Sequence, residues 1–173
     1  DKDNFIGRPY LYFCYGASVS EVIIDTLTGE NRVLKVDILQ DAGKAINPAI
    51  ELGQIYGGFV QGMGWHTTEQ IDWKLDGEIL SKNFSTYKIP TASDMPKKFN
   101  ARIFKNENKE AVVNKSKTTG EPPLLQAASV FFALKDAIHS INNYNPKVLP
   151  ILDSPATAEA ILMSIQKLKS TNK

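Results

Sequence analysis

One carboxylate, Glu121, stands between residues that control the backbone on both sides of it. Pro122 and Pro123 lack N–H groups, and each disfavours the helical region for the residue before it. We therefore expect Glu121 and Pro122 to be extended and a helix to begin near Pro123, while Gly120 permits an unusual approach path. A stiff, buried carboxylate suits a general base, because the protein then sets its position and basicity. The alternative is a glutamate that only accepts hydrogen bonds from nearby backbone N–H groups.

A second candidate is the glycine-rich segment of residues 53–64, which lies inside a predicted helix. Asn47 is a capping residue and Pro48 suits the first helical position, so we expect the helix to run from 48 to about 70. Gln54 and Gln61 share a helix face, which predicts a shallow groove with an amide at each end. An amide donates and accepts hydrogen bonds, which suits an oxo group or the edge of a pterin-like ring. The alternative is close packing against another element, with the glutamines paired internally.

The number of glycines in this helix needs an explanation, because each glycine lowers helix stability by about 1 kcal/mol relative to alanine in a helix interior. Close approach of another group is the reason we expect. They do not follow a strand at the spacing of a dinucleotide-binding motif. The five are Gly53, Gly57, Gly58, Gly62 and Gly64.

Other kinds of site are poorly supported. The two histidines, His66 and His139, are far apart and have no nearby cysteine, so we expect no metal bound by side chains of this chain. The sequence has no Gly-x-Ser-x-Gly motif for a serine nucleophile. Cys14, the single cysteine, lies in an apolar run, and we expect it to be a buried small hydrophobe.

Composition limits the partners and the compartment. The 173 residues carry a net charge of +1, which gives no basic field for nucleic acid. No apolar run approaches the roughly 20 residues of a membrane helix. A single cysteine cannot form an internal disulfide, so we expect a cytoplasmic protein. An apolar strand pattern begins by Tyr10, without an initiating Met, so we expect a fragment cut from a longer subunit.

Periodicity predicts an α+β fold of mixed strands with two long buried helices. Residues 10–39 indicate a hairpin, with Gly29 at a position of positive φ in its turn. We expect a second hairpin over 73–81 around Asp76-Gly77, and strands over 85–89 and 99–104. The second long helix is expected from 122 to about 142, and residues 124–134 are apolar nearly all round, which predicts burial. A last helix is expected over 157–168, capped by Thr157.

Several of these segments together resemble the molybdenum hydroxylase family, and within it the xanthine dehydrogenase group. Residues 62–69 resemble the bacterial members of that group. The resemblance runs from near residue 7 to near residue 168, and its ordered set of motifs is specific. The sequence departs from the family's pattern at Lys117-Thr118-Thr119, where the family often has Lys-Ala-Val. We expect this difference to alter hydrogen bonding near Glu121. The motifs, in the family's order and spacing, are Asn47-Pro48-Ala49-Ile50, Gly53-Gln54, Gly58-Phe59-Val60-Gln61-Gly62-Met63-Gly64, Ser85-Thr86-Tyr87-Lys88-Ile89-Pro90, Gly120-Glu121-Pro122-Pro123 and Asp153-Ser154-Pro155-Ala156-Thr157.

The resemblance implies that residues 1–173 are the C-terminal part of the second molybdenum-cofactor-binding domain of a larger subunit. It implies hydroxylation of hypoxanthine and xanthine to urate with oxygen from water, with Glu121 as the base. It also implies that Gln54, with Gly53 and Gly120, contacts the molybdenum–molybdopterin cofactor. The implied partners are the purine substrate, the rest of the molybdenum subunit, and an iron–sulfur and FAD subunit. Electrons would pass through 2Fe–2S clusters and FAD to NAD.

Two alternatives remain open from the sequence. The first is a related enzyme, an aldehyde oxidoreductase or another N-heterocycle hydroxylase, in which Glu121 would serve equally. The second is that the isolated chain is a folded but inert cofactor-binding module. One cysteine cannot ligate an iron–sulfur cluster, so this chain cannot transfer electrons through one of its own.

Overall fold

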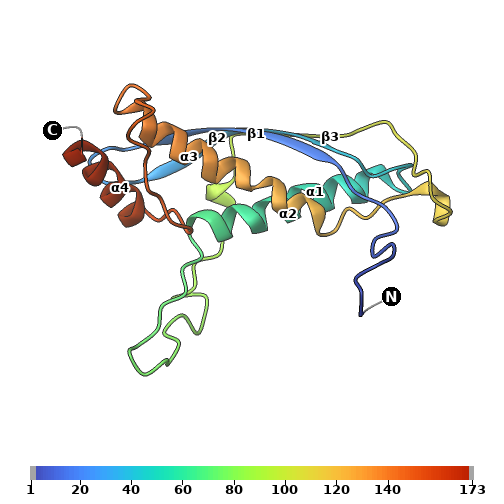
Figure 1. Ribbon diagram of the computed structural model, residues 1–173, viewed down its shortest axis with the longest axis horizontal. Helices are drawn as coiled ribbons and strands as arrows, with labels where there is room; N and C mark the ends of the chain where they lie inside the picture. The colour runs from blue at the N-terminus through green and yellow to red at the C-terminus, as the bar shows by residue number, and fades with distance from the viewer. Residues whose placement is uncertain (1–2, 172–173) are drawn as a thin grey trace.

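A three-stranded sheet with helices on one face forms the framework of the computed structural model, which describes residues 3–171 (Figure 1). Strand β1 (Gly16–Ile24) pairs antiparallel with β2 (Asn31–Gln40), and β2 pairs parallel with β3 (Lys98–Ile103). Gly29 has φ +77° in the β1–β2 turn, where Asp25 Oδ1 accepts a hydrogen bond from the N–H of Leu27. The predicted hairpin and the α+β class are confirmed.

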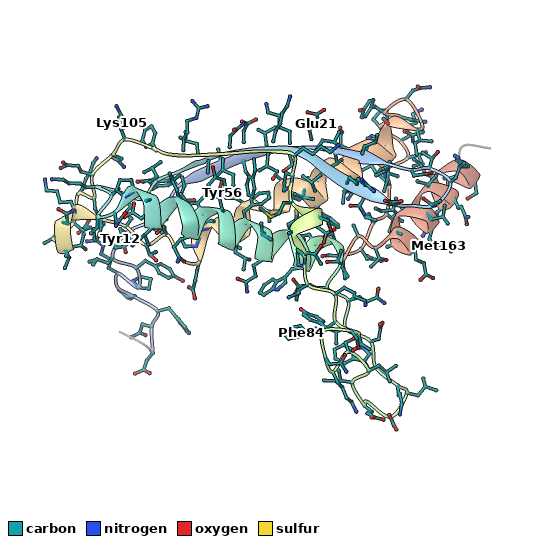
Figure 2. The ribbon with its side chains drawn as sticks, turned by 180° about the vertical axis from the view of Figure 1, so that it is seen from behind. Tyr12, Glu21, Tyr56, Phe84, Lys105 and Met163 are labelled. Carbon is teal, nitrogen blue, oxygen red and sulfur yellow. The ribbon has the colours of Figure 1, made fainter. Side chains whose placement is uncertain are left out.

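Helix α1 (Pro48–Thr67) begins as the sequence predicts. The Oδ1 atom of Asn47 accepts hydrogen bonds from the N–H groups of Ala49 and Ile50, at 3.2 and 3.3 Å. The helix ends a few residues before the expected position, because the Thr68 N–H already closes the last turn on Gly64 O. Tyr56 ties α1 to the sheet, since its hydroxyl accepts a hydrogen bond from the N–H of Ala101 in β3 (Figure 2).

The second long helix is divided, which the sequence did not predict. Helix α2 (Pro122–Gln126) and helix α3 (Ala128–Ser140) are separated at Ala127, whose N–H reaches back to Leu124 O. The expectation of complete burial is also wrong: Leu125 is 75% exposed and Phe132 is 63% exposed. The packed face of these helices meets α1 and β1, and α3 also contacts α4.

The last helix, α4 (Ala158–Thr171), has the predicted cap, because Thr157 Oγ1 accepts a hydrogen bond from the Ala160 N–H at 3.2 Å. Helices α1, α3 and α4 and the inner face of the sheet enclose the core, and burial of each large apolar side chain contributes about 1.5–3 kcal/mol. Its largest fully buried apolar side chains include Phe59, Ile55, Leu134, Ile138, Ile161 and Ile165.

Between α1 and a short 3-10 turn at Ala92–Asp94, residues 70–90 extend from the body as an arm (Figure 1). The bridge between Trp73 and Ile79 and the positive φ of Gly77 confirm the second hairpin in a minimal form. The strand expected over 85–89 is wrong. Asn83 organises a turn there, accepting hydrogen bonds at its backbone oxygen from the Thr86 and Tyr87 N–H groups. Across residues 3–171, no helix combines the length and apolar character needed to cross a membrane.

Candidate cofactor-binding and active site

Two glycines of α1 allow helix α2 to approach closely. A Cβ atom on Gly62 would lie 2.3 Å from the carbonyl oxygen of Leu124 and 2.8 Å from the Cβ of Ala127. A Cβ on Gly58 would lie 3.3 Å from the Cβ of Pro123 and 3.4 Å from the carbonyl oxygen of Gly120. The close-packing interpretation is therefore correct for Gly58 and Gly62. Their helix cost is offset by a contact that brings the Glu121 segment against α1.

The other two central glycines face open space. Beyond its chain neighbours and the backbone of its own helix, a Cβ on Gly53 or Gly57 would meet no atom of the described chain within 4 Å, and both residues are exposed. Gln54 and Gln61 are exposed as well, so they are not paired internally. Along the first turns of α1, the helix face at Gly53 and Gly57 is therefore bare of side chains, whereas Gly58, which the predicted groove included, is covered by α2.

Gln54 and Gly120 connect the two predicted halves of the site. The Oε1 atom of Gln54 lies 3.7 Å from the position that a Cβ of Gly120 would occupy. Gly53 is adjacent to Gln54, and Glu121 is adjacent to Gly120. The structure therefore brings Gln54 and Gly120 together where the segment before α2 passes the first turns of α1, and Gly53 and Glu121 are their neighbours in the sequence.

Glu121 is the N-cap residue of α2, with φ −104° and ψ −38°. The expectation that Glu121 and Pro122 are both extended is wrong, because the helix begins one residue earlier, at Pro122. The Glu121 side chain makes no capping hydrogen bond, so the alternative role in satisfying backbone N–H groups is not observed. The burial that we expected is also wrong for this chain, in which Glu121 is exposed. The result is a carboxylate on a proline-restricted helix start, available to a group outside the chain.

Sequence reasoning missed two residues that support this loop, Asp41 and Lys117. Their carboxylate and ammonium groups lie 2.5 Å apart, with side chains only 3% and 7% exposed. Burial raises the pKa of Asp41, but hydrogen bonds from Lys117 and from the Gly43 N–H outweigh it, and the pKa lies below its ordinary value. Asp41 directly follows β2, and Lys117 lies shortly before Gly120. The two residues are 76 positions apart in the sequence, so no local sequence pattern links Asp41 to Lys117.

The remaining titratable candidates form no second site. Cys14 is half-buried, not fully buried as expected, and its S–H donates to the Thr118 carbonyl oxygen at 3.4 Å. Burial raises the pKa of this thiol, which disfavours the reactive thiolate. Burial lowers the pKa of His66, whose ring lies 5.7 Å from that of Phe131. Within residues 3–171, no cluster of three or more His, Cys, Asp or Glu side chains could hold a metal ion.

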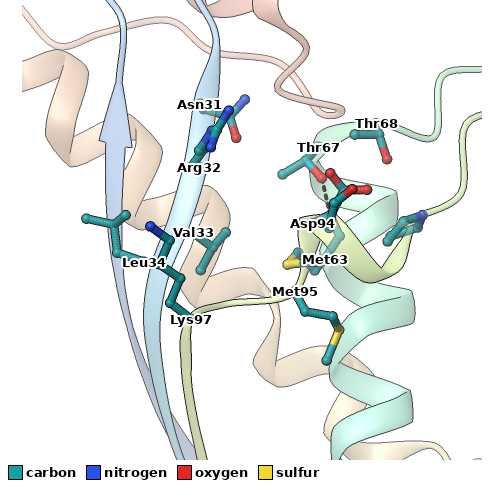
Figure 3. Close-up of a pocket in the computed structure, with 12 residues that line it drawn as sticks. Asn31, Arg32, Val33, Leu34, Met63, Thr67, Thr68, Asp94, Met95 and Lys97 are labelled. Carbon is teal, nitrogen blue, oxygen red and sulfur yellow. Dashed lines mark hydrogen bonds between the residues drawn. The ribbon is translucent and has the colours of Figure 1, made fainter.

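A cavity of about 130 Å³ lies at the C-terminal end of α1, between that helix and β2 (Figure 3). Met63 and Thr67 of α1 line it with Asp94 and Met95, and Thr67 Oγ1 donates to Met63 O within its wall. None of the predicted site residues lines this cavity. The exposed start of α1 beside Gly120, and not this cavity, is the candidate site.

Comparisons with known proteins identify the protein family of this chain. Residues 1–96 match the family model of the molybdopterin cofactor-binding domain, and this stretch contains Gly53 and Gln54. The chain is 44% identical over 159 residues to xanthine dehydrogenase/oxidase of Felis catus, an alignment that covers 90% of this chain. The chain belongs to the molybdenum hydroxylase family. The fold is accordingly the molybdenum-cofactor-binding domain of the xanthine dehydrogenase and aldehyde oxidase type.

Other molybdenum hydroxylases are similar over most of the chain. Aldehyde oxidase 2 of Macaca fascicularis is 38% identical over 165 residues, which cover 95% of this chain. The crystal structure of quinoline 2-oxidoreductase from Pseudomonas putida 86 superposes with a TM-score of 0.75 and 31% identity, over 84% of this chain and 18% of that one. The chain spans 12% of the length of each of the two curated relatives.

The residues present fit the cofactor of this family. Gly53 and Gly57 leave open space above the first turns of α1, which an added Cβ would begin to fill. The exposed amide of Gln54 can donate to and accept from polar atoms of a pterin, and it lies beside Gly120. A helix face without side chains at Gly53 and Gly57, with the Gln54 amide beside it, is suited to a flat polar group.

Proposed function

We propose that this chain is the C-terminal part of the molybdopterin-binding domain in the large subunit of a xanthine dehydrogenase. In this proposal Glu121 is the general base in the hydroxylation of hypoxanthine and xanthine to urate, with oxygen from water. The observation that carries the proposal is that Glu121, with an exposed and uncapped carboxylate, directly follows Gly120, which lies beside Gln54. The 44% identity to a xanthine dehydrogenase/oxidase supports this reaction among those of the family.

Each site residue has a separate role. Gln54 holds the cofactor through its amide, and Gly53 and Gly120 leave room for it. When bound, the molybdenum cofactor supplies the two-electron redox chemistry. Glu121 accepts the proton of the water-derived oxygen as that oxygen bonds to an electron-poor carbon of the purine ring. The hydrogen on that carbon leaves as hydride, whose two electrons the bound cofactor would accept. A positioned general base contributes typically about 10²–10⁴-fold to the rate.

The rest of the enzyme completes the site in this proposal. Glu121 is exposed here, and a base of this kind requires water to be excluded, so the remainder of the molybdenum subunit must cover it. Electrons leave through 2Fe–2S clusters and FAD on other domains or subunits and reach NAD. The isolated chain is then an inert cofactor-binding module. The expected cytoplasmic location stays a prediction.

A second candidate is an aldehyde oxidoreductase or another N-heterocycle hydroxylase. The similarity to aldehyde oxidase 2 and to quinoline 2-oxidoreductase favours this reading, and Glu121 would be the base there too. Steady-state assays of the intact enzyme on xanthine, hypoxanthine, quinoline and an aldehyde separate the two candidates. We expect the two purines to have the highest kcat/KM, and a higher value for quinoline or the aldehyde would contradict the proposed substrate.

A further inference from the structure

The segment that leads to Glu121 is paired with the loop that follows β2. Gly43 and Ser116 form an isolated antiparallel bridge. The Lys117 N–H donates to Ala42 O at 2.8 Å, and the Lys44 N–H donates to Lys115 O at 3.0 Å. Gly43 has φ +61°, and a Cβ there would lie 2.6 Å from Lys115 O, so the two loops can approach this closely only at a glycine.

A buried ion pair lies across this pairing. Lys117 Nζ donates to Asp41 Oδ2 at 2.5 Å, and Asn106 Nδ2 donates to the same oxygen at 3.2 Å. The Gly43 N–H donates to Asp41 Oδ1 at 2.9 Å. The ammonium of Lys117 also lies 5.3 Å from the centre of the Tyr15 ring. Burying two charges carries a large desolvation penalty, which is offset only when the geometry is good and the other lone pairs are satisfied, as they are here.

The next residue, Thr118, is held on both sides of its peptide backbone by residues 12–15. Its N–H donates to the Tyr12 hydroxyl at 3.2 Å, and its carbonyl oxygen accepts from the Cys14 thiol at 3.4 Å. Figure 2 shows Tyr12 at the end of the molecule where α1 begins. Lys117 and Thr118 are thus held by side chains from two different segments, while Gly120 beyond them has no side chain to restrain it.

We propose that the buried Asp41–Lys117 pair is a positioning device that holds Glu121 in register with Gln54. The inference rests on the proposed role of Glu121 as base. The ion pair anchors one end of the Lys117–Glu121 segment, and the start of α2 anchors the other end against Gly58 and Gly62. The two anchors confine Gly120 and place the carboxylate relative to α1. A general base displaced by about 1 Å can lose on the order of 10² in rate.

The test compares three variants of the intact enzyme. Lys117→Met removes the ammonium and leaves Asp41 unpaired. Asp41→Asn/Lys117→Met removes both charges, so that no buried charge is left without a partner. Lys115→Met is the matched control, because it breaks an exposed pair with Glu107 in the same loop. The readouts are molybdenum content, melting temperature, amide hydrogen exchange of residues 115–121, and the rate of reduction by saturating xanthine.

We expect the double variant to keep its molybdenum and melt near the wild-type temperature, yet to exchange amides of residues 115–121 at least about tenfold faster. We expect its reduction rate to fall by about 10–100-fold, with KM changed less than about threefold, and the control to match wild type. A double variant with wild-type exchange or a wild-type reduction rate would overturn the positioning role. The exchange readout does not depend on catalysis, so failure of Glu121 as base would instead appear as an unchanged rate in Glu121→Gln.

Discussion

The side-chain oxygen of Gln54 lies 3.7 Å from the point that a Cβ of Gly120 would occupy, although the two residues belong to segments far apart in the sequence. The approach depends on Gly58 and Gly62, which let α2 pack against the next turns of α1. One consequence is that Gln54 and Glu121 are positioned by the same helix pair. A change in this packing is therefore expected to alter cofactor binding and proton transfer together.

Glu121→Gln keeps the size of the side chain and removes its basicity. Pro122 and Pro123 hold the helix start, so we expect folding and molybdenum content to change little. The rate of enzyme reduction by xanthine should fall by about 10⁴-fold, the upper end for loss of a general base. Stopped-flow measurement, normalised to molybdenum, gives this rate, and Glu107→Gln is the control because Glu107 is an exposed carboxylate in the same loop system. A fully loaded variant within about threefold of wild type, well under 1 kcal/mol, would exclude Glu121 as the base.

Gln54→Ala removes the amide beside Gly120. We expect slower turnover or weaker retention of the cofactor by about tenfold, which corresponds to roughly 1.4 kcal/mol and one lost hydrogen bond. Gln61→Ala is the matched comparison, since Gln61 is also exposed but lies two turns further along α1. Molybdenum content and turnover number distinguish the two variants. If both variants had the molybdenum content and turnover number of wild type, Gln54 would have no role in the site.

Gly62→Ala and Gly57→Ala are expected to have opposite effects on local stability. The new Cβ at residue 62 would lie 2.3 Å from Leu124 O, and overpacking of this kind costs about 1–3 kcal/mol. The new Cβ at residue 57 meets nothing within 4 Å in this chain, so the helix should gain up to about 1 kcal/mol. Native-state hydrogen exchange of α1 and α2 in the cofactor-free enzyme measures both. Equal protection in the two variants would contradict the close helix contact at Gly62.

Stability should acquire an acid dependence from Asp41. Its pKa in the folded chain is lowered from the ordinary value, so the carboxylate contributes stability that is present above the unfolded-state pKa of about 3.9. This contribution is lost as the pH falls through the lower, folded-state pKa. The melting temperature of wild type should therefore fall relative to that of Asp41→Asn/Lys117→Met below about pH 4. A constant difference between pH 7 and pH 3 would show that Asp41 does not titrate as its contacts require.

The isolated chain of 173 residues should bind no molybdenum and oxidise no xanthine. Gly53 and Gln54 lie exposed on α1, and beyond the chain neighbours and helix backbone of Gly53 no described atom lies within 4 Å of its Cβ position. Metal analysis of the purified chain, with an assay using an artificial electron acceptor, tests this. Stoichiometric molybdenum or measurable turnover would show that the chain holds a complete site.

Short-range signals in the sequence determined where several elements begin and turn. The cap at Asn47, the cap at Thr157 and the positive φ of Gly29 each depend on hydrogen bonds or backbone preferences within a few residues, and each is observed as predicted. The motifs also indicated candidate site residues. Glu121 and Gln54 were predicted separately, and the fold brings their segments together.

Only the tertiary structure decided what each glycine does and how the Glu121 segment is held. Gly58 and Gly62 contact α2 while Gly53 and Gly57 face open space, although all four cost the helix about the same. Asp41 and Lys117 pair across 76 residues because two loops meet beside the start of α1. The exposure of Glu121 likewise depends on how the surrounding elements pack, and in the described chain none of them covers this residue. Such contacts arise from the packing of whole elements, and local backbone preferences act over only a few residues.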